Sequence, residues 1–243
     1  MIEELQKIIN ESDNIVFFGG AGVSTESGIP DFRSQDGLYN QEYDYPPELI
    51  LSHSFFITNK KEFYEFYFDK LVNIDIKPNY THIFLKELED KGKLKGIVTQ
   101  NIDGLHEMAG SKNIYNLHGT IYKNHCMECG KEYTLNDILG QEIPTCTCGG
   151  TIKPDVVLYE EPLDNDTFEG AEKIISECDT LIIGGTSLNV YPAAYIINRF
   201  NGKNLIIINK DKLYINYPGV NIIQINDSIG ETFKKINIGG KNE

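Results

Sequence analysis

The chain has 243 residues, 40% of them hydrophobic and 24% charged, a composition typical of an ordinary globular protein and unlike that of a disordered one. Its formal net charge of −14 argues against general nucleic-acid binding and is compatible with cationic partners such as lysine-rich peptides, although solubility alone would also explain it. No apolar run approaches the roughly 18 residues of a membrane span, and the first residues lack a signal-peptide pattern, so we expect a cytoplasmic protein that binds neither nucleic acid nor membrane.

A helix and a buried strand are expected at the start of the chain. Residues 2–12 carry apolar side chains at a helical period, and residues 14–18 form an apolar run. The run leads into a glycine-rich stretch, residues 19–39, GGAGVSTESGIPDFRSQDGLY. A strand, a glycine turn and a helix begin many nucleotide-binding α/β folds, in which glycines let the backbone approach a phosphate and the helix start attracts anions. We therefore expect this loop to hold a phosphate-bearing ligand.

The loop departs from the dinucleotide fingerprint G-x-G-x-x-G. Gly20 and Gly22 supply its first two glycines, but Thr25 occupies the third position. No strand ending in an acid follows about 20 residues later, as the fingerprint requires. A dinucleotide in this loop is therefore not expected to be held for hydride transfer, which makes an NAD dehydrogenase the weakest candidate function.

The middle and the end of the chain predict an α/β fold. Residues 39–73 are rich in Tyr and Phe, and we expect two or three helices there, starting near Pro47 and Asn59, that build a core and cover one side of the ligand site. Beyond them, strands and helices alternate, which implies a doubly wound, Rossmann-like parallel sheet. The predicted helices are residues 79–91, 164–178, 192–200 and 228–236, and the predicted strands are residues 95–99, 113–117, 153–159, 180–183, 205–208 and 220–225.

Several predicted strands end in small or polar residues. In open α/β sheets, ligands bind at the carboxyl ends of the strands. We therefore expect one crevice to which all of these ends contribute. The strand ends are Gly19, Gln100, His118, Gly185 and Asn209.

Four of the five cysteines form two pairs, Cys126-x-x-Cys129 and Cys146-x-Cys148, with sixteen residues between the pairs. Clustered cysteines in a cytoplasmic chain are more often metal ligands than disulfides, and this spacing suits tetrahedral zinc. A set of free thiols is the alternative. Four thiolates leave no position for a catalytic water, so we expect one structural zinc, with His125 outside the ligand set.

The predicted fold is therefore a doubly wound α/β domain with two insertions. The helical insertion comprises residues 41–74, and the four-cysteine zinc module comprises residues 122–150. The Rossmann-like domain is then discontinuous and consists of residues 1–40, 75–121 and 151–243.

Four stretches follow one another in this order: GAGVSTESGIPDFRS, TQNIDGLH, LHGT with the cysteine pairs directly after it, and GTSLNVYPA followed by INKD. Together they resemble the sirtuin family of NAD-dependent protein lysine deacylases, in its bacterial form. The resemblance covers about residues 14–236. It implies NAD as co-substrate, a structural zinc, and acetylated lysine-containing proteins or peptides as partners.

The resemblance also implies which residues bind the reactive half of NAD. Phe32 would shield the reactive ribose carbon, and Arg33, one of only two arginines in the chain, would lie near the phosphates, where its planar fork suits an anion. The diphosphate loop itself would be lined by Gly20, Ala21, Gly22 and Thr25.

A second stretch, QNID, and the following histidine would provide the chemistry. Gln100 and Asn101 would hydrogen-bond the nicotinamide ribose, and Ile102 and Asp103 would form the carboxamide pocket. His118 would be the general base, a role that suits a side chain titrating near neutral pH. The catalytic residues are thus His118 and Asn101. From the residues alone, helix capping is an alternative for Asn101 and Asp103.

The remaining contacts implied by the resemblance involve adenosine and the peptide. An edge strand would pair with an extended substrate peptide by β-augmentation, although these side chains also suit an ordinary sheet edge. The adenosine half would be held by Gly185, Thr186, Ser187, Asn209 and Lys210, with Ile229 against the adenine. The peptide would lie between Val156, Val157 and Leu158 on one side and residues 188–191, including Leu188 and Val190, on the other.

In the chemistry of that family, the acyl-lysine carbonyl oxygen attacks the ribose carbon that bears nicotinamide. The expected function is therefore transfer of an acetyl group from lysine to ADP-ribose, with release of nicotinamide and O-acetyl-ADP-ribose. Two alternatives use the same NAD site: a protein ADP-ribosyltransferase and a non-catalytic NAD-sensing interaction module.

Two positions, Gly19 and Glu160, depart from the family pattern. Gly19 stands where many relatives have Thr, and Glu160-Glu161 stands where many have Gly-Glu. The extra acid predicts a preference for basic residues beside the substrate lysine. The stretch NQEYDYPPE lacks the arginine that accompanies removal of acidic acyl groups, so we expect neutral acyl groups such as acetyl.

Overall fold

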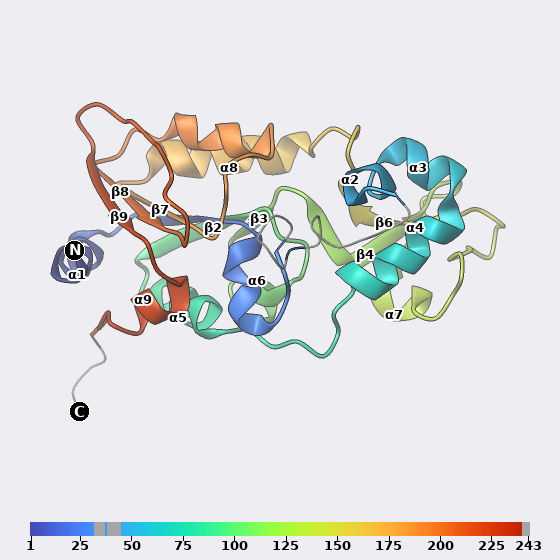
Figure 1. Ribbon diagram of the computed structural model, residues 1–243, viewed down its shortest axis with the longest axis horizontal. Coiled ribbons are helices and arrows are strands. Elements are labelled where there is room, and N and C mark those ends of the chain that lie inside the picture. The colour runs from blue at the N-terminus through green and yellow to red at the C-terminus, as the bar shows by residue number, and fades with distance from the viewer. Residues whose placement is uncertain (32–36, 38–44, 240–243) are drawn as a thin grey trace.

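The computed structural model describes residues 1–31, 37 and 45–239 (Figure 1). Its larger part is a parallel sheet with the strand order β3-β2-β1-β7-β8-β9. The chain runs outward from β1 in one direction and then from β7 in the other, so the predicted doubly wound sheet is confirmed. The strands are β1 (Ile15–Gly19), β2 (Leu94–Thr99), β3 (Ile114–Asn116), β7 (Thr180–Gly184), β8 (Asn204–Ile208) and β9 (Asn221–Ile225).

Helices cover both faces of this sheet. Phe17 of β1 packs into the core on one face, while Val16 and Phe18 pack into the core on the other. In Figure 1, α8 lies above the sheet and α1, α5 and α9 lie below it. Burial on both faces explains why the strands are unbroken apolar runs. The covering elements are α1 (Ile2–Glu11), α5 (Tyr80–Asp90), α8 (Asn165–Glu177), the 3-10 helix η5 (Ala193–Arg199) and α9 (Ile229–Phe233).

A small lobe contains a second, antiparallel sheet with the order β5-β4-β6. The aromatic helices pack on this sheet: Phe56 and Tyr64 share one core with Ile121, Leu135 and Ile152. The predicted helical insertion and the predicted zinc module therefore share a single core. The elements of the small lobe are α2 (Pro47–Ile50), α3 (His53–Thr58), α4 (Lys60–Phe66), the π-helical turn η4 (Tyr67–Leu71), β4 (Gly119–Cys126), β5 (Glu132–Thr134), α7 (Leu135–Ile138) and β6 (Ile152–Val156).

Two local features differ from the sequence prediction. The strand predicted at residues 153–159 ends at Val156 and forms the edge of the small sheet, not part of the parallel one. The glycine loop continues as two 3-10 turns, η1 (Ala21–Val23) and η2 (Thr25–Ser27), and the expected helix is absent from the described part of this loop. Gly28, at φ +96°, ends the second turn in a left-handed conformation that favours glycine.

Within the described residues, no helix is both long and apolar enough to span a membrane.

The remaining helix, α6 (Leu105–Met108), follows the QNID stretch and begins beside the carboxyl end of β2. The ends of β1, β2, β7 and β8 therefore meet at one edge of the large sheet, next to the start of β4.

Candidate functional site

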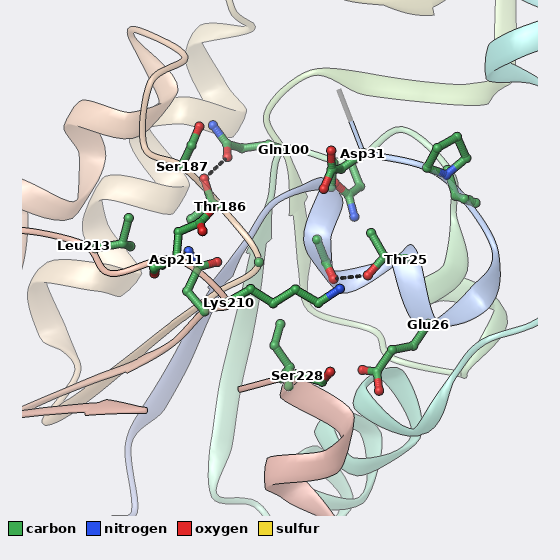
Figure 2. Close-up of a pocket in the computed structure, with 18 of the residues that line it drawn as sticks. Thr25, Glu26, Asp31, Gln100, Thr186, Ser187, Lys210, Asp211, Leu213 and Ser228 are labelled. Carbon is green, nitrogen blue, oxygen red and sulfur yellow. Dashed lines mark hydrogen bonds between the residues drawn. The ribbon is translucent and has the colours of Figure 1, made fainter. Parts of the chain in front are cut away.

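A cavity of about 810 Å³ opens at this edge of the sheet (Figure 2). Its size falls in the range of small-molecule and cofactor sites. The expected crevice at the strand ends is thus present, and it receives residues from every predicted loop. The predicted residues that line it are Ala21, Gly22, Thr25, Gln100, Asn101, His118, Gly185, Thr186, Ser187, Val190, Asn209, Lys210 and Ile229.

The glycines at the base of the cavity let two loops touch. The Gly22 N–H donates to the Gly185 carbonyl at 2.8 Å. A Cβ on Gly22 would lie 2.7 Å from the Gly185 Cα, and Gly185 itself has φ +60°. Glycine is therefore required at both positions by contact between the loop after β1 and the loop after β7. From the sequence, Gly22 is expected to line the diphosphate loop and Gly185 to contact the adenosine half.

Gln100 joins the same two loops and offers an unused donor. Its side-chain oxygen accepts a hydrogen bond from the Thr186 hydroxyl at 2.9 Å (Figure 2). Its Nε2 is buried and has no hydrogen-bond partner within the described part of the chain. Buried amide donors are rarely left unpaired in proteins. Because Gln100 lines the cavity, an acceptor on a bound ligand would satisfy this group.

Ser24 organises the QNID stretch, and its side chain is fully buried. Asn101 Nδ2 donates to Ser24 Oγ at 3.1 Å, and Ser24 Oγ donates to Asp103 Oδ2 at 2.6 Å. One hydroxyl thereby fixes the side chains of both Asn101 and Asp103. Ser24 belongs to the glycine motif, but its role was not predicted from the sequence.

Asp103 also contacts the following helix. Its Oδ1 accepts from the Leu105 N–H at 3.0 Å, at the first residue of α6. The N-cap residue of α6 is Gly104, and Asn101 bonds Ser24, so neither Asn101 nor Asp103 is the N-cap. Burial raises the pKa of Asp103, while the hydrogen bonds from Ser24 and Leu105 oppose that rise. Its neighbour Ile102 packs against the core of the small lobe.

His118 is held in the tautomer that a general base needs. Its Nδ1 lies 2.9 Å from the Gln100 carbonyl oxygen. A carbonyl only accepts hydrogen bonds, so Nδ1 carries the proton and Nε2 keeps its lone pair. The ring lines the cavity. Burial lowers the pKa of His118, and the bond to Gln100 offsets part of that lowering, so the neutral form is favoured.

The far end of the cavity is formed by β8 and α9. Figure 2 shows the Lys210 side chain reaching across the cavity toward Thr25. Ile229, the first residue of α9, lines the cavity and is buried. Glu26 connects this end to the glycine loop, because its carboxylate accepts from the Gly230 N–H at 2.8 Å. This role of Glu26 was not predicted from the sequence, because its partner is 204 residues away along the chain.

The predicted peptide edge lies beside His118. The Val157 N–H donates to the His118 carbonyl at 3.0 Å, and the Leu158 N–H donates to the Glu161 carboxylate at 2.9 Å. Val156 pairs with Gly119 of β4. These main-chain groups are thus fixed inside the protein, and pairing of this segment with a substrate stays a prediction.

On the opposite side of the predicted peptide site, Leu188 has φ +56° and Val190 lines the cavity. A non-glycine residue in the left-handed region is strained, and such residues often occur at functional sites. Two further predicted cofactor residues, Phe32 and Arg33, lie outside the described residues, as does most of the NQEYDYPPE stretch.

The four clustered cysteines form a site that fits zinc. Their Sγ atoms all lie within 4.8 Å of one another, and the Cys126–Cys148 and Cys129–Cys146 sulfurs are 3.5 and 3.6 Å apart. These separations far exceed the roughly 2.05 Å of a disulfide. They approach the sulfur separation of about 3.8 Å that Zn–S bonds of about 2.3 Å give in a tetrahedron. The predicted ligand set is therefore confirmed as one cluster.

Neighbouring polar groups support this cluster. The Tyr133 hydroxyl donates to Cys146 Sγ at 3.0 Å. The Cys148 N–H and this hydroxyl lower the pKa of Cys146, which favours the thiolate that zinc needs. His125 pairs with the Asp155 carboxylate and stays outside the ligand set, as predicted.

Comparison with known proteins shows that residues 20–192 match the model of the Sir2 family. The chain belongs to the Sir2 family. The NAD-dependent protein deacetylase of Clostridium acetobutylicum is 55% identical over 240 residues, which cover 97% of each chain. That of Clostridium perfringens is also 55% identical, over 97% of this chain and 98% of the relative. A Sir2 structure with a p53 peptide and NAD+ has 34% identity and a TM-score of 0.84, covering 97% of this chain and 96% of the other.

The departures from the Sir2 pattern have local explanations. At Gly19, a Cβ would come within 2.6 Å of the Phe17 ring, which fills the space beside it. Glu160 has φ +75°, the left-handed conformation that a glycine adopts readily. The chain places a strained glutamate there, and its carboxylate accepts from both the N–H and the hydroxyl of Ser54 at the start of α3.

Proposed function

We propose that this chain is an NAD-dependent protein lysine deacetylase. It transfers the acetyl group of an acetyl-lysine side chain to ADP-ribose, with release of nicotinamide and O-acetyl-ADP-ribose. The support comes from the two relatives of that name, which are 55% identical over nearly the whole chain. The Sir2 structure with a p53 peptide and NAD+ supports the same substrate pair.

The observation that carries this proposal is the state of His118. A general base for a ribose hydroxyl must be neutral, must reach the ligand and must present a free nitrogen. His118 lines the cavity, and its Nδ1 is engaged by the Gln100 carbonyl, which leaves Nε2 as the acceptor. Because burial lowers the pKa of His118, the neutral form that a base requires is favoured.

The cavity also fits NAD. Its volume of about 810 Å³ suits a dinucleotide, and the Nε2 of Gln100, which has no partner among the described residues, offers a donor to a ribose oxygen. When bound, NAD supplies the ribose carbon from which nicotinamide leaves and the ribose hydroxyl that receives the acetyl group. The proposed diphosphate and adenosine contacts are Gly20, Ala21, Gly22, Thr25, Arg33, Gly185, Thr186, Ser187, Asn209, Lys210 and Ile229.

In this proposal the QNID stretch orients the reacting groups. Ser24 holds Asn101 and Asp103 by hydrogen bonds, so neither side chain has to be ordered when the ligand binds. Asp103, with Ile102, faces the nicotinamide carboxamide, and Asn101 orients the ribose. Phe32 excludes water from the reacting carbon. His118 takes the proton of the attacking hydroxyl at Nε2.

The small lobe has a structural part in this scheme. Zinc bound by the four cysteines would fix the loops beside β4 and β6 and would take no part in the chemistry, because four thiolates would leave no position for a catalytic water. The peptide would lie along Val156, Val157 and Leu158 on one side and Leu188 and Val190 on the other. The five cysteines form no disulfide bond, which suits a reducing compartment and supports a cytoplasmic location.

Mass spectrometry of the products tests the proposal. Incubation with NAD and an acetyl-lysine peptide should yield free lysine peptide, nicotinamide and O-acetyl-ADP-ribose, with little turnover of a succinyl-lysine peptide. Replacing His118 by Ala should lower kcat by about 10²- to 10⁴-fold. ADP-ribose attached to protein, or O-acetyl-ADP-ribose formed at the original rate by His118→Ala, would contradict it.

A further inference from the structure

A buried lysine and a glutamate meet behind the proposed peptide edge. Lys153 of β6 is 8% exposed, and its Nζ lies 3.0 Å from Glu161 Oε2. The side chain of Glu161 is 17% exposed. A buried ion pair is expensive to build and gives little stability by itself, so its presence calls for another explanation.

The Lys153 and Glu161 side chains both hydrogen-bond the main chain of residues 156–158, which lie between them in the sequence. Lys153 Nζ donates to the Val156 carbonyl at 3.0 Å, and Glu161 Oε2 accepts from the Leu158 N–H at 2.9 Å. The Val157 N–H donates to the His118 carbonyl. All three residues of the proposed peptide edge are therefore held by the ion pair or by the residue proposed as the base.

Further hydrogen bonds connect this segment to the helices of the small lobe. Glu161 Oε1 lies 2.8 Å from His53 Nδ1, at the start of α3. Tyr159 exchanges main-chain hydrogen bonds with Leu51 and His53, at 2.9 and 3.0 Å. The segment is thus fastened between the α3 start on one side and His118 on the other.

The charge state of Glu161 agrees with this arrangement. Burial alone raises the pKa of Glu161, but the Leu158 N–H, His53 and the Lys153 ammonium outweigh it and hold the pKa below its usual range. The carboxylate is therefore ionised and can accept all three contacts at once.

We propose that Lys153 and Glu161 are positioning residues that hold the main chain of residues 156–158 in the conformation that pairs with the acyl-lysine peptide. The inference rests on the proposed function, since it assigns this edge to the substrate. Neither residue touches the cavity, so their removal affects peptide recognition and leaves NAD recognition intact.

The test is a Glu161→Gln variant, which keeps the shape and removes the charge. The peptide KM should rise about tenfold, while kcat and the KM for NAD stay within about twofold of the wild type. Glu142→Gln is the matched control, because Glu142 pairs with Lys61 in the same lobe but both side chains are more than half exposed. It should leave all three constants unchanged.

Two further variants separate positioning from stability. Lys153→Arg keeps the charge and should stay within about threefold of the wild-type peptide KM. The double variant Lys153→Met with Glu161→Gln removes both charges and so leaves no unpaired buried ion. It should recover most of the thermal stability lost in Glu161→Gln and still show the raised peptide KM.

Fluorescence anisotropy with a labelled acetyl-lysine peptide gives a readout that needs no turnover. Weaker peptide binding by Glu161→Gln, with unchanged NAD affinity, supports the inference. An unchanged peptide affinity, or equal losses for peptide and NAD, overturns it. If the wild type binds the peptide but forms no O-acetyl-ADP-ribose, the proposed function fails while the peptide measurement still decides the role of the ion pair.

Discussion

The two sites of this molecule are built in opposite ways. The four cysteines turn their sulfurs toward one another within 4.8 Å and come from a single stretch of about twenty residues. The cavity draws on the ends of β1, β2, β7 and β8 and leaves groups such as Gln100 Nε2 without a partner in the described structure. A permanent ion is held by a closed, local ligand set, whereas a substrate site keeps unused hydrogen-bonding capacity and depends on the whole sheet.

Zinc removal is expected to have the largest effect, and it tests the contribution of the four-cysteine site to stability. Structural zinc contributes on the order of 10 kcal/mol of folding free energy in small domains. Chelation, or Cys126→Ser, should therefore unfold the small lobe and abolish deacetylation. Zinc content and thermal melting followed by circular dichroism check this outcome. Cys178→Ser is the control, because Cys178 is buried by itself in the large lobe and should leave the zinc content unchanged.

A pair of buried histidines should make the fold sensitive to acid. The rings of His82 and His106 lie 4.7 Å apart, and neither nitrogen of His106 has a partner among the described residues. Burial lowers the pKa of His82 to about 4, and burial together with His82 lowers the pKa of His106 well below its usual value.

The sign of this effect follows from which state binds protons. Above pH 6.5 neither the folded nor the unfolded chain protonates these rings. As the pH falls below 6.5, the two histidines bind protons in the unfolded chain but not in the folded chain. Each histidine therefore lowers the free energy of unfolding by about 1.4 kcal/mol per pH unit. His82 alone accounts for about 3 kcal/mol by pH 4.

Urea unfolding between pH 7.5 and 5.5 measures this slope before most carboxylates titrate. His106→Leu should roughly halve the slope, since one of the two histidines is gone. A free energy of unfolding that stays constant down to pH 5.5 would show that the two rings accept protons in the folded state.

Ser24→Ala tests the cavity site by removing a single hydroxyl group. Loss of the hydroxyl frees both Asn101 and Asp103, and we expect kcat/KM to fall about 30-fold, or about 2 kcal/mol. Ser27→Ala is a matched control in the same loop, because the Ser27 hydroxyl is buried without a partner in the described structure. Equal activity losses in the two variants would assign the effect to the loop as a whole and not to the Ser24 bonds.

The same contrast explains how much could be predicted from the sequence. The cysteine cluster and the doubly wound parallel sheet follow from local spacing and from the alternation of strands and helices, and both predictions are confirmed. The packing of Phe56 and Tyr64 on β4 and β6 was not predicted, because their partners lie about 60 to 100 residues away along the chain. The bonds of Ser24 and Glu26 were missed for the same reason, because their partners lie 77 to 204 residues away. The motif identified the loop, but only folding brings these partners together.

The smallest expected effect concerns the Tyr133 hydroxyl, which hydrogen-bonds one of the four cysteines. Tyr133→Phe removes its bond to Cys146 Sγ and leaves the four sulfurs and the packing of the ring in place. Groups that hydrogen-bond metal ligands typically change metal affinity by about tenfold when removed. Zinc transfer to a chromophoric chelator should therefore be faster in Tyr133→Phe, while activity with zinc bound stays near that of the wild type. Tyr214→Phe is the control, because that side chain is 90% exposed and follows β8, in the large lobe. Equal rates of zinc transfer in Tyr133→Phe and the wild type would mean that the four thiolates alone determine zinc affinity. The groups around the cysteines would then contribute nothing measurable to zinc binding.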